Sequence, residues 1–190
     1  MKKVIFSFVF LMALGIISAE ARNFSLSIGA GMRNVKGVEN ENGLNLYNEV
    51  YRKNHMIYSI DLGYRVSKSL QVFLHYDSFS VNGKLTYTEE DTKLTINPLE
   101  LGIRFFMSKR LIFPYIGAGT GYYMYKEENV IGTMNEKKFS FFGEGGLQFR
   151  YTRLLFLDLK VKYIFLKVDG PEANADLGGW ALIGGMGISF

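Results

Sequence analysis

Hydrophobic and polar residues alternate along most of the chain, and the apolar positions lie two apart rather than three or four apart. In residues 56–66, for example, Ile60 and Tyr64 lie on one face of an extended chain and Asp61 on the other. Such alternation is typical of β-strands that have one apolar face. It recurs in eight segments, which are 23–32, 56–66, 70–77, 98–107, 114–124, 139–151, 154–164 and 178–190.

The connections between these segments alternate in length. Tight turns are expected at 67–69, 108–110 and 152–153, and long polar loops at about 34–54, 81–93, 126–136 and 167–176. An even number of antiparallel strands, with short turns at one rim and long loops at the other, is the layout of outer-membrane β-barrels. We therefore predict an all-β fold, an eight-stranded antiparallel up-and-down transmembrane β-barrel.

Pro98 marks a change of phase within its segment. Before it, Leu94 and Ile96 are the apolar positions, and after it Leu99 and Leu101 are. The apolar set therefore passes from even to odd positions, as it would if one extra residue were inserted into the strand. We expect a β-bulge at Pro98.

Charged residues indicate which face of the barrel is outside. The apolar face carries no Asp, Glu, Lys or Arg between the rims, as a lipid-facing surface requires. A soluble lipocalin-like barrel would show the same period with the two faces exchanged, and its charged positions would be solvated. The opposite face carries Asp61, Arg65, His75, Asp77, Glu100, Arg104, Glu144, Arg150, Asp158, Lys160 and Lys162.

This charged set predicts a filled lumen. Ionised groups withdrawn from water are tolerated when they are paired and hydrogen-bonded, and the set contains five acids and five bases besides the histidine. An eight-stranded barrel has room for side chains but not for a wide water channel. We expect these residues to form a mutually neutralising network that plugs the barrel.

The first residues predict export from the cytoplasm. Lys2 and Lys3 precede an apolar run, residues 4–17, which is shorter than the roughly 20 residues of a membrane-spanning helix. Ala19 and Ala21 then provide a small-residue cleavage site, so we expect a signal peptide at 1–21, cut before Arg22. An uncleaved membrane anchor is the alternative. Residues 22–190 would then form a single domain.

Composition excludes several classes of protein. The chain has no cysteine, which excludes lipoprotein anchoring, disulfides and thiol chemistry. A formal net charge of +4 is too small to imply a nucleic-acid partner. His55 and His75 lie far apart in sequence, and residues 89–91 lack the spacing of a calcium loop. We expect no metal, no cofactor and no catalytic residues.

The sequence resembles the outer-membrane β-barrel domain family, which includes proteins similar to the transmembrane domain of outer membrane protein A and to opacity proteins. The stretches that carry the resemblance are NPLELGIRFFM (97–107), PYIGAGTGYYM (114–124), FGEGGLQFRY (142–151) and the closing ISF. The resemblance implies residence in the outer membrane of a diderm bacterium, with both mature termini in the periplasm. No cell-wall-binding module follows Phe190, so peptidoglycan attachment is not expected.

The resemblance also implies an assembly signal in the terminal strand. In such proteins a final aromatic residue, with apolar residues at alternate positions before it, is recognised by the barrel-assembly machinery. The matching residues are Trp180, Leu182, Met186, Ile188 and Phe190, whereas Gly184 departs from the pattern.

Three functions are compatible with these observations. The first is a plugged structural barrel that displays four long loops for interaction with host or cell-surface ligands. The second is a narrow pore or, by a weaker likeness to outer membrane protein W, a channel for hydrophobic solutes lined by Phe73, Phe79, Phe106, Phe142 and Phe156. The third and most remote is a hydrolase that uses His75 with Asp77, for which no paired serine is visible. The balanced charges favour the first, with outer-membrane lipid as a partner and a monomeric state.

Overall fold

The structure is a computed structural model that describes residues 23–36, 50–51, 54–84, 90–107, 111–129, 132–169 and 174–190. The predicted signal peptide, with Ala19, Ala21 and Arg22 at its cleavage site, lies outside the described residues, as does the turn expected at 108–110. Among the described residues, no helix has the length and apolar character needed to cross a membrane.

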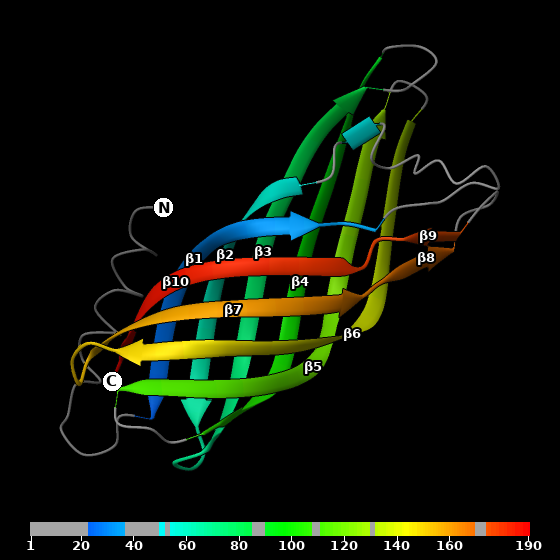
Figure 1. The fold of residues 1–190 in the computed structure, drawn as a ribbon. Helices are drawn as coiled ribbons and strands as arrows, with labels where there is room; N and C mark the ends of the chain where they lie inside the picture. The colour runs from blue at the N-terminus through cyan, green and yellow to red at the C-terminus, as the bar shows by residue number, and fades with distance from the viewer. Residues whose placement is uncertain are drawn as a thin grey trace, which may run out of the picture.

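Nearly all of the described chain is β-strand (Figure 1). The strands are β1 (Phe24–Asn34), β2 (Asn54–Arg65), β3 (Leu70–Lys84), β4 (Asp91–Phe106), β5 (Ile112–Asn129), β6 (Gly132–Arg150), β7 (Leu155–Phe165), β8 (Lys167–Asp169), β9 (Asn174–Asp176) and β10 (Gly179–Ser189). Strands β1 to β7 and β10 close into a barrel in the order β1-β10-β7-β6-β5-β4-β3-β2, and β8 pairs with β9 in a separate small sheet. The predicted antiparallel barrel of eight strands is confirmed.

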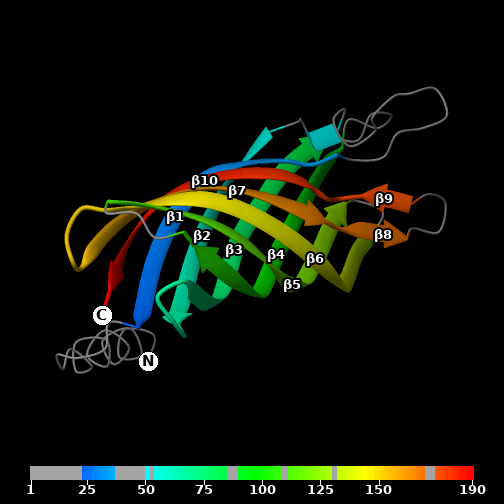
Figure 2. The ribbon, with the colours of Figure 1, turned by 60° about the horizontal axis from the view of Figure 1, so that its bottom comes forward.

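The barrel closes where the last strand pairs with the first, and Figures 1 and 2 show β10 beside β1 in both views. The pairing runs from Ser25 opposite Ser189 to Arg33 opposite Ala181. At the turn-side rim, the backbones of Phe24 and Phe190 exchange two hydrogen bonds of 2.9 Å, and their rings stack at 6.2 Å. Closure of this seam leaves the transmembrane sheet without a free edge.

The tight turns have local sequence causes. The Oγ of Ser67 accepts a hydrogen bond from the backbone N–H of Leu70 at 3.1 Å, and the Oγ1 of Thr152 accepts one from that of Leu155 at 2.9 Å. Short side chains that bond their own backbone two or three residues on stabilise such turns. The turns predicted at 67–69 and 152–153 are therefore confirmed.

The strands are longer on the loop side than the sequence predicts. The β3–β4 pairing continues to Lys84 opposite Asp91, and the β5–β6 pairing to Asn129 opposite Gly132. Most of the loop expected at 126–136, and the ends of the one expected at 81–93, are therefore strand. In Figure 1 the two hairpins extend beyond the end of β1.

The bulge expected at Pro98 is absent. Strand β4 pairs with β5 without any shift, from Lys93 opposite Glu128 to Phe106 opposite Tyr115. Leu94 and Ile96 point inward like Glu100, and each of the three side chains is at most 1% exposed. The prediction was wrong because the inward positions of β4 keep the same phase along the whole strand. Only their character changes, from apolar at Leu94 and Ile96 to charged at Glu100.

An apolar cluster lies inside the barrel, with most of its members on the loop side of the charged residues. Along β3, Phe79 follows the charged Asp77, and along β7, Ile164 follows Lys162. The buried members are Val35, Tyr51, Ile57, Phe73, Phe79, Leu94, Ile96, Tyr123, Tyr125, Phe142, Ile164, Leu166, Leu177, Ala181 and Ile183. The core therefore lies inside the barrel, while the outer wall is apolar as well.

Gly31 allows the seam to close, and this can be tested. A Cβ at Gly31 would lie 2.0 Å from the carbonyl oxygen of Leu182 on β10, so the Gly31→Ala variant must move the backbone. We expect it to lower the free energy of unfolding by about 1–3 kcal/mol. Gly184→Ala on the same seam is the control, because a Cβ there meets nothing within 4 Å, and it should change stability by less than about 0.5 kcal/mol. Urea unfolding in phospholipid vesicles, followed by Trp180 fluorescence, measures both, and equal losses would contradict the steric explanation.

Candidate functional site: the charged lumen

Alternation on five strands places eight ionisable residues in the middle of the lumen. Neighbouring strands set them side by side, with Asp61 opposite His75, His75 opposite Glu100, and Glu144 opposite Lys162. We call this set the lumen charge network, and its members are Asp61, His75, Asp77, Glu100, Arg104, Glu144, Lys160 and Lys162. All eight are less than 9% exposed.

Lys162 joins opposite walls of the barrel. Its strand β7 and the strand β3 are separated by three strands in either direction around the barrel. The Nζ of Lys162 donates to Asp77 Oδ2 at 2.5 Å and to Glu100 Oε2 at 2.8 Å. The hydroxyl of Tyr123 donates to the other oxygen of Glu100 at 2.6 Å. The lysine side chain therefore spans the lumen and connects three strands.

Arg104 organises the part of the network nearer the turns. Its Nη2 donates to Asp61 Oδ1 at 2.8 Å, and its Nε donates to Glu144. The guanidinium carbon lies 3.8 Å from the centre of the Phe73 ring, a cation–π arrangement. Lys160 reaches Asp61 from β7 on the other side. Asp61 thus accepts from two cations that come from different walls.

His75 connects these two parts. Its Nδ1 lies 2.8 Å from Asp61 Oδ2, and its Nε2 lies 2.7 Å from Asp77 Oδ1. Ionised carboxylates only accept hydrogen bonds, so a doubly protonated His75 ring would donate to both of them; Lys160 Nζ also lies 3.4 Å from its Nδ1. The network then contains four carboxylates and four cations, so its charges balance.

Three residues predicted for this network lie outside its ion pairs. Asp158 accepts hydrogen bonds of 3.0 and 3.1 Å from the hydroxyl of Tyr115. Arg65 donates to Gln148 Oε1 at 3.2 Å, and Arg150 lies over the ring of Phe113 at 4.5 Å. Among the described residues, none of the three has an oppositely charged group within ion-pair distance.

Sequence reasoning missed several interior polar groups. Arg33 is 1% exposed, donates to the carbonyl oxygen of Leu177 at 2.9 Å, and lies over the Phe79 ring. Arg33 continues the odd-numbered inward positions of the first strand, which include Gly29 and Gly31. The alternation would have identified Arg33 as inward-facing if the predicted strand had been extended beyond residue 32. Tyr115 and Tyr123 were not included among the site residues, although their hydroxyls donate to the buried acids Asp158 and Glu100.

The network has no open coordination site for a metal ion. His75, Asp77 and Glu100 are close enough together to supply three ligands. However, the ammonium group of Lys162 contacts both carboxylates, and His75 is already bonded through both nitrogens. A cation of this protein's own therefore fills the position that a metal would take.

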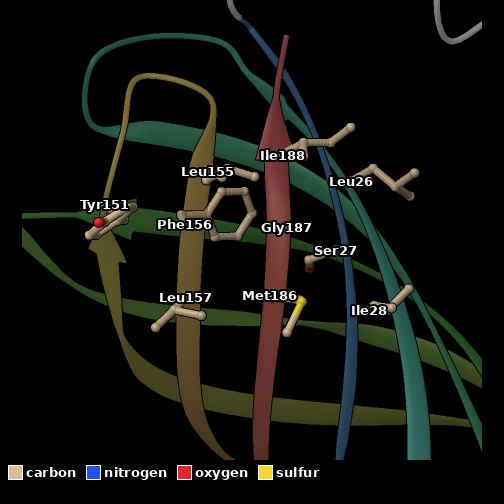
Figure 3. A pocket seen from close by; sticks show the side chains of 10 residues that line it. All are labelled: Leu26, Ser27, Ile28, Tyr151, Leu155, Phe156, Leu157, Met186, Gly187 and Ile188. Carbon is tan, nitrogen blue, oxygen red and sulfur yellow. The ribbon is translucent and has the colours of Figure 1, made fainter.

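The residues of the predicted assembly signal face outward on β10. Trp180, Leu182 and Met186 are more than half exposed, Ile188 is 41% exposed, and Phe190 is at the turn-side rim. On the same wall, side chains of β7, β10 and β1 surround an apolar hollow of 510 Å³, with Leu157, Met186 and Ile28 around it (Figure 3). This surface has the character of a wall that contacts lipid.

A closed barrel with an apolar outer wall and a filled polar lumen defines a transmembrane β-barrel protein. The chain belongs to the family of outer membrane protein beta-barrel domains, which it matches over residues 6–190. It is therefore an outer-membrane protein of the eight-stranded barrel type. A comparison with curated protein sequences finds no match.

Solved structures share the fold. Outer membrane protein OprG of Pseudomonas aeruginosa is similar with a TM-score of 0.70 and 14% identity, over 91% of this chain and 98% of that one. Neisserial surface protein A has a TM-score of 0.66 and 13% identity, over 91% and 100%. Ail, the attachment invasion locus protein of Yersinia pestis, solved with the heparin analogue sucrose octasulfate, has a TM-score of 0.59 and 19% identity, over 88% and 98%. At these identities the likeness shows the fold alone.

A buried and an exposed lysine pair allow a matched test of the network. Lys162→Met removes the ammonium group that is bonded to both Asp77 and Glu100, at a site that is 0% exposed. We expect it to lower the free energy of unfolding by about 3–5 kcal/mol, because two buried carboxylates lose their bonded ammonium group and keep only His75 and Tyr123 as partners. Lys126→Met breaks the pair with Glu128, whose side chains are 46% and 45% exposed, and should leave stability nearly unchanged. Urea unfolding in vesicles measures both, and a Lys162→Met barrel as stable as the control would show that the network is hydrated.

Proposed function

We propose that this protein is a sealed outer-membrane barrel that serves as a rigid scaffold for interactions at its loop-side surface. One observation carries the proposal: the inward side chains are inaccessible to water at two successive levels. Glu100 and Lys162 in the charge network are each 0% exposed, and so are Phe79 and Ile96 in the apolar cluster. A continuous water-filled pore would require accessible side chains at every level.

The aromatic residues that would line a channel instead fill the lumen. Phe73, Phe79, Phe106, Phe142 and Phe156 are at most 5% exposed. Phe73 packs edge-on against Phe142 at 6.0 Å, and its face is covered by Arg104. At the loop end, Val35 and Leu177 are buried as well. These contacts support the scaffold over both the pore and the hydrophobic-solute channel.

The hydrolase alternative has the least support. A general base needs one ring nitrogen free to accept a proton, but both nitrogens of His75 are bonded to carboxylates. The ring is also 1% exposed, so no substrate reaches it. We propose that the protein is not an enzyme.

The loop side provides the surface for interaction. Strands β3 to β6 continue beyond their contacts with β2 and β7, which end at Tyr58 opposite Ser78 and at Phe141 opposite Phe165. The resulting extension is a paired sheet with a packed apolar inner face, so it presents its outer positions rigidly. The complex of Ail with sucrose octasulfate supports the idea that a barrel of this fold can hold a ligand.

Orientation and partners are part of the same proposal. The short turns and the barrel ends of β1 and β10 share one rim, which we assign to the periplasm, with the long side outside the cell. Lipid acyl chains would occupy the apolar hollow on the outer wall. The strand β10 would be the contact of the barrel-assembly machinery, and the barrel would be a monomer.

Conductance distinguishes the scaffold from a pore. The refolded protein, shown to be folded by its heat-modifiable migration, should produce no current steps in a planar lipid bilayer because both lumen layers are closed. An open porin added afterwards to the same bilayer serves as the positive control. Stable ohmic steps from the protein alone would refute the sealed lumen.

The assembly role of the last strand needs a test that separates recognition from stability. Phe190→Ala should reduce the amount of heat-modifiable folded protein in outer-membrane fractions of growing cells. The same variant should refold at nearly the normal yield in lipid vesicles that contain no assembly machinery. Phe105→Ala, which removes a lipid-facing ring from β4, is the control and should assemble normally in cells. Equal loss in cells and in vesicles would mean that Phe190 acts only through its packing on Phe24.

A further inference from the structure

Two arginines from opposite walls meet at the turn-side mouth of the lumen. Arg65 is the last residue of β2 and Arg150 the last of β6, and three strands separate β2 from β6 in either direction around the barrel. Arg65 reaches across the mouth, where its Nη2 donates to Gln148 Oε1 at 3.2 Å. Gln148 and Arg150 are two residues apart on the inward face of β6. The two guanidinium groups are therefore neighbours, and their like charges repel each other.

Both guanidinium groups lack an anionic partner within the described part of the chain. Arg65 donates to two neutral oxygens, the Gln148 amide and the Lys68 carbonyl, the latter at 3.5 Å. The Nε of Arg150 is buried there without any hydrogen-bond partner. Both residues are half-buried. Charges that are partly withdrawn from water in this way are costly unless an opposite charge joins them.

The carboxylates on this side of the barrel are placed elsewhere. Asp158 is opposite Gln148, and it accepts hydrogen bonds of 3.0 and 3.1 Å from a tyrosine hydroxyl. The C-terminal carboxylate belongs to Phe190, at the end of β10. Within the described residues, neither carboxylate is at ion-pair distance from Arg65 or Arg150. The charge of the two arginines is therefore not cancelled locally.

The turns at this rim add positive charge. The two described turns contain Lys68 and Arg153, and the turn at 108–110, outside the described residues, has the sequence Ser-Lys-Arg. None of the three contains Asp or Glu. Residues 1–22 also lie outside the described residues, and their only acid, Glu20, is in the segment that we expect to be cleaved. A rim of this composition attracts anions toward the mouth.

Aromatic rings hold both guanidinium groups in place. The guanidinium carbon of Arg65 lies 4.4 Å from the centre of the Phe106 ring, and that of Arg150 lies 4.5 Å from the centre of the Phe113 ring. Cation–π contacts position a guanidinium group but do not neutralise it. Phe106 is itself 2% exposed and packs against Tyr115 at 5.1 Å. The donors are thus arranged before a ligand binds, which lowers the entropic cost of binding.

Two fixed guanidinium groups select a multiply charged oxyanion. Guanidinium groups bind phosphate and carboxylate through paired hydrogen bonds. A carboxylate has a single negative charge and would neutralise only one of the two arginines. A phosphate monoester carries nearly two negative charges and three acceptor oxygens, so it can accept from both arginines at once.

We propose that Arg65 and Arg150 form a binding site for a phosphate monoester at the turn-side mouth, on the rim that we assign to the periplasm. The site is at the opposite end of the barrel from the interaction surface proposed above, so it is an additional function and does not rest on that one. A soluble phosphate compound and a phosphorylated lipid at the rim carry the same group, and both can supply it.

NMR of the arginine Nε–H groups reads the site directly. The protein, with isotope-labelled arginine, is placed in phosphatidylcholine nanodiscs and titrated with glycerol phosphate at constant ionic strength. Acetate and chloride are the counter-probes. We expect glycerol phosphate to shift the resonances of Arg65 and Arg150 and to leave that of Arg104 in place, because its Nε already donates to Glu144. The absence of a shift, or an equal shift with acetate or chloride, would overturn the proposal.

Matched variants place the anion. Arg65→Gln and Arg150→Gln should each weaken binding by about tenfold or more, the loss expected for a charged hydrogen bond, as read from the resonance of the arginine that remains. Arg153→Gln removes the same charge from an exposed position of the rim, where it is screened, and should change affinity by less than about twofold. Heat-modifiable migration shows that each variant is folded, and the titration of the unchanged protein tests the site without them. If all three variants weaken binding equally, the rim attracts anions only through its overall charge and the proposed site is wrong.

The source of the phosphate group is read by changing the lipid. If a lipid is the source, both resonances are already shifted in nanodiscs that contain phosphatidic acid, a monoester, and glycerol phosphate has no further effect there. If a soluble compound is the source, both resonances shift only on titration, whichever lipid is present. Either result supports a site for a phosphate monoester. Shifts caused by phosphatidylglycerol, a diester, as large as those caused by phosphatidic acid would overturn it.

Discussion

Ion pairs that cross the lumen are the constraint on which the rest of the barrel depends. A lysine on β7 and carboxylates on β3 and β4 belong to opposite walls, so their contacts set the distance across the interior. Leaving any one of these charges without a partner in a space without water costs several kcal/mol, roughly as much as a large cavity in a core. Eight strands enclose only a narrow lumen, and charges in a narrow lumen without water must be paired. The charges inside this barrel are therefore balanced. With His75 as the fourth cation, the balance is complete within eight residues.

The inner and outer faces exchange character where the strands leave the membrane. Along β4, Leu101 points outward and Glu100 inward, whereas further toward the loops Lys93 points outward and Leu94 inward. The strand geometry is the same in both parts. Inside the membrane the solvent is hydrocarbon and the interior holds the charges, and beyond it the solvent is water and the interior must be apolar. The strand alternation could be predicted from sequence, but the move of the apolar residues from one face to the other at Pro98 was wrongly attributed to a backbone bulge.

The same reasoning explains which parts of the site could be predicted. Period-two counting found every member of the lumen charge network, because an inward position in the membrane half is marked by its charge. It also included Arg65 and Arg150, which share that face but lie near the turns, where Gln148 and aromatic rings are their neighbours. Pairing across the lumen depends on which strands are opposite, and alternation along one strand carries no information about that. Arg33 was missed for the opposite reason, because its strand was ended too early.

The separation of β2 from β3 follows from the change of surroundings. Within the membrane every backbone group must be paired, since hydrocarbon offers no hydrogen bonds, and the wall is continuous there. Beyond Tyr58 and Ser78 water can satisfy the strand edges, so the two strands are free to follow different neighbours. Outward positions of β3 become polar at this same level, at Ser78 and Ser80, which are exposed. The two strands therefore separate at the level where the membrane constraint ends, just beyond the outward-facing Tyr58 and Tyr76.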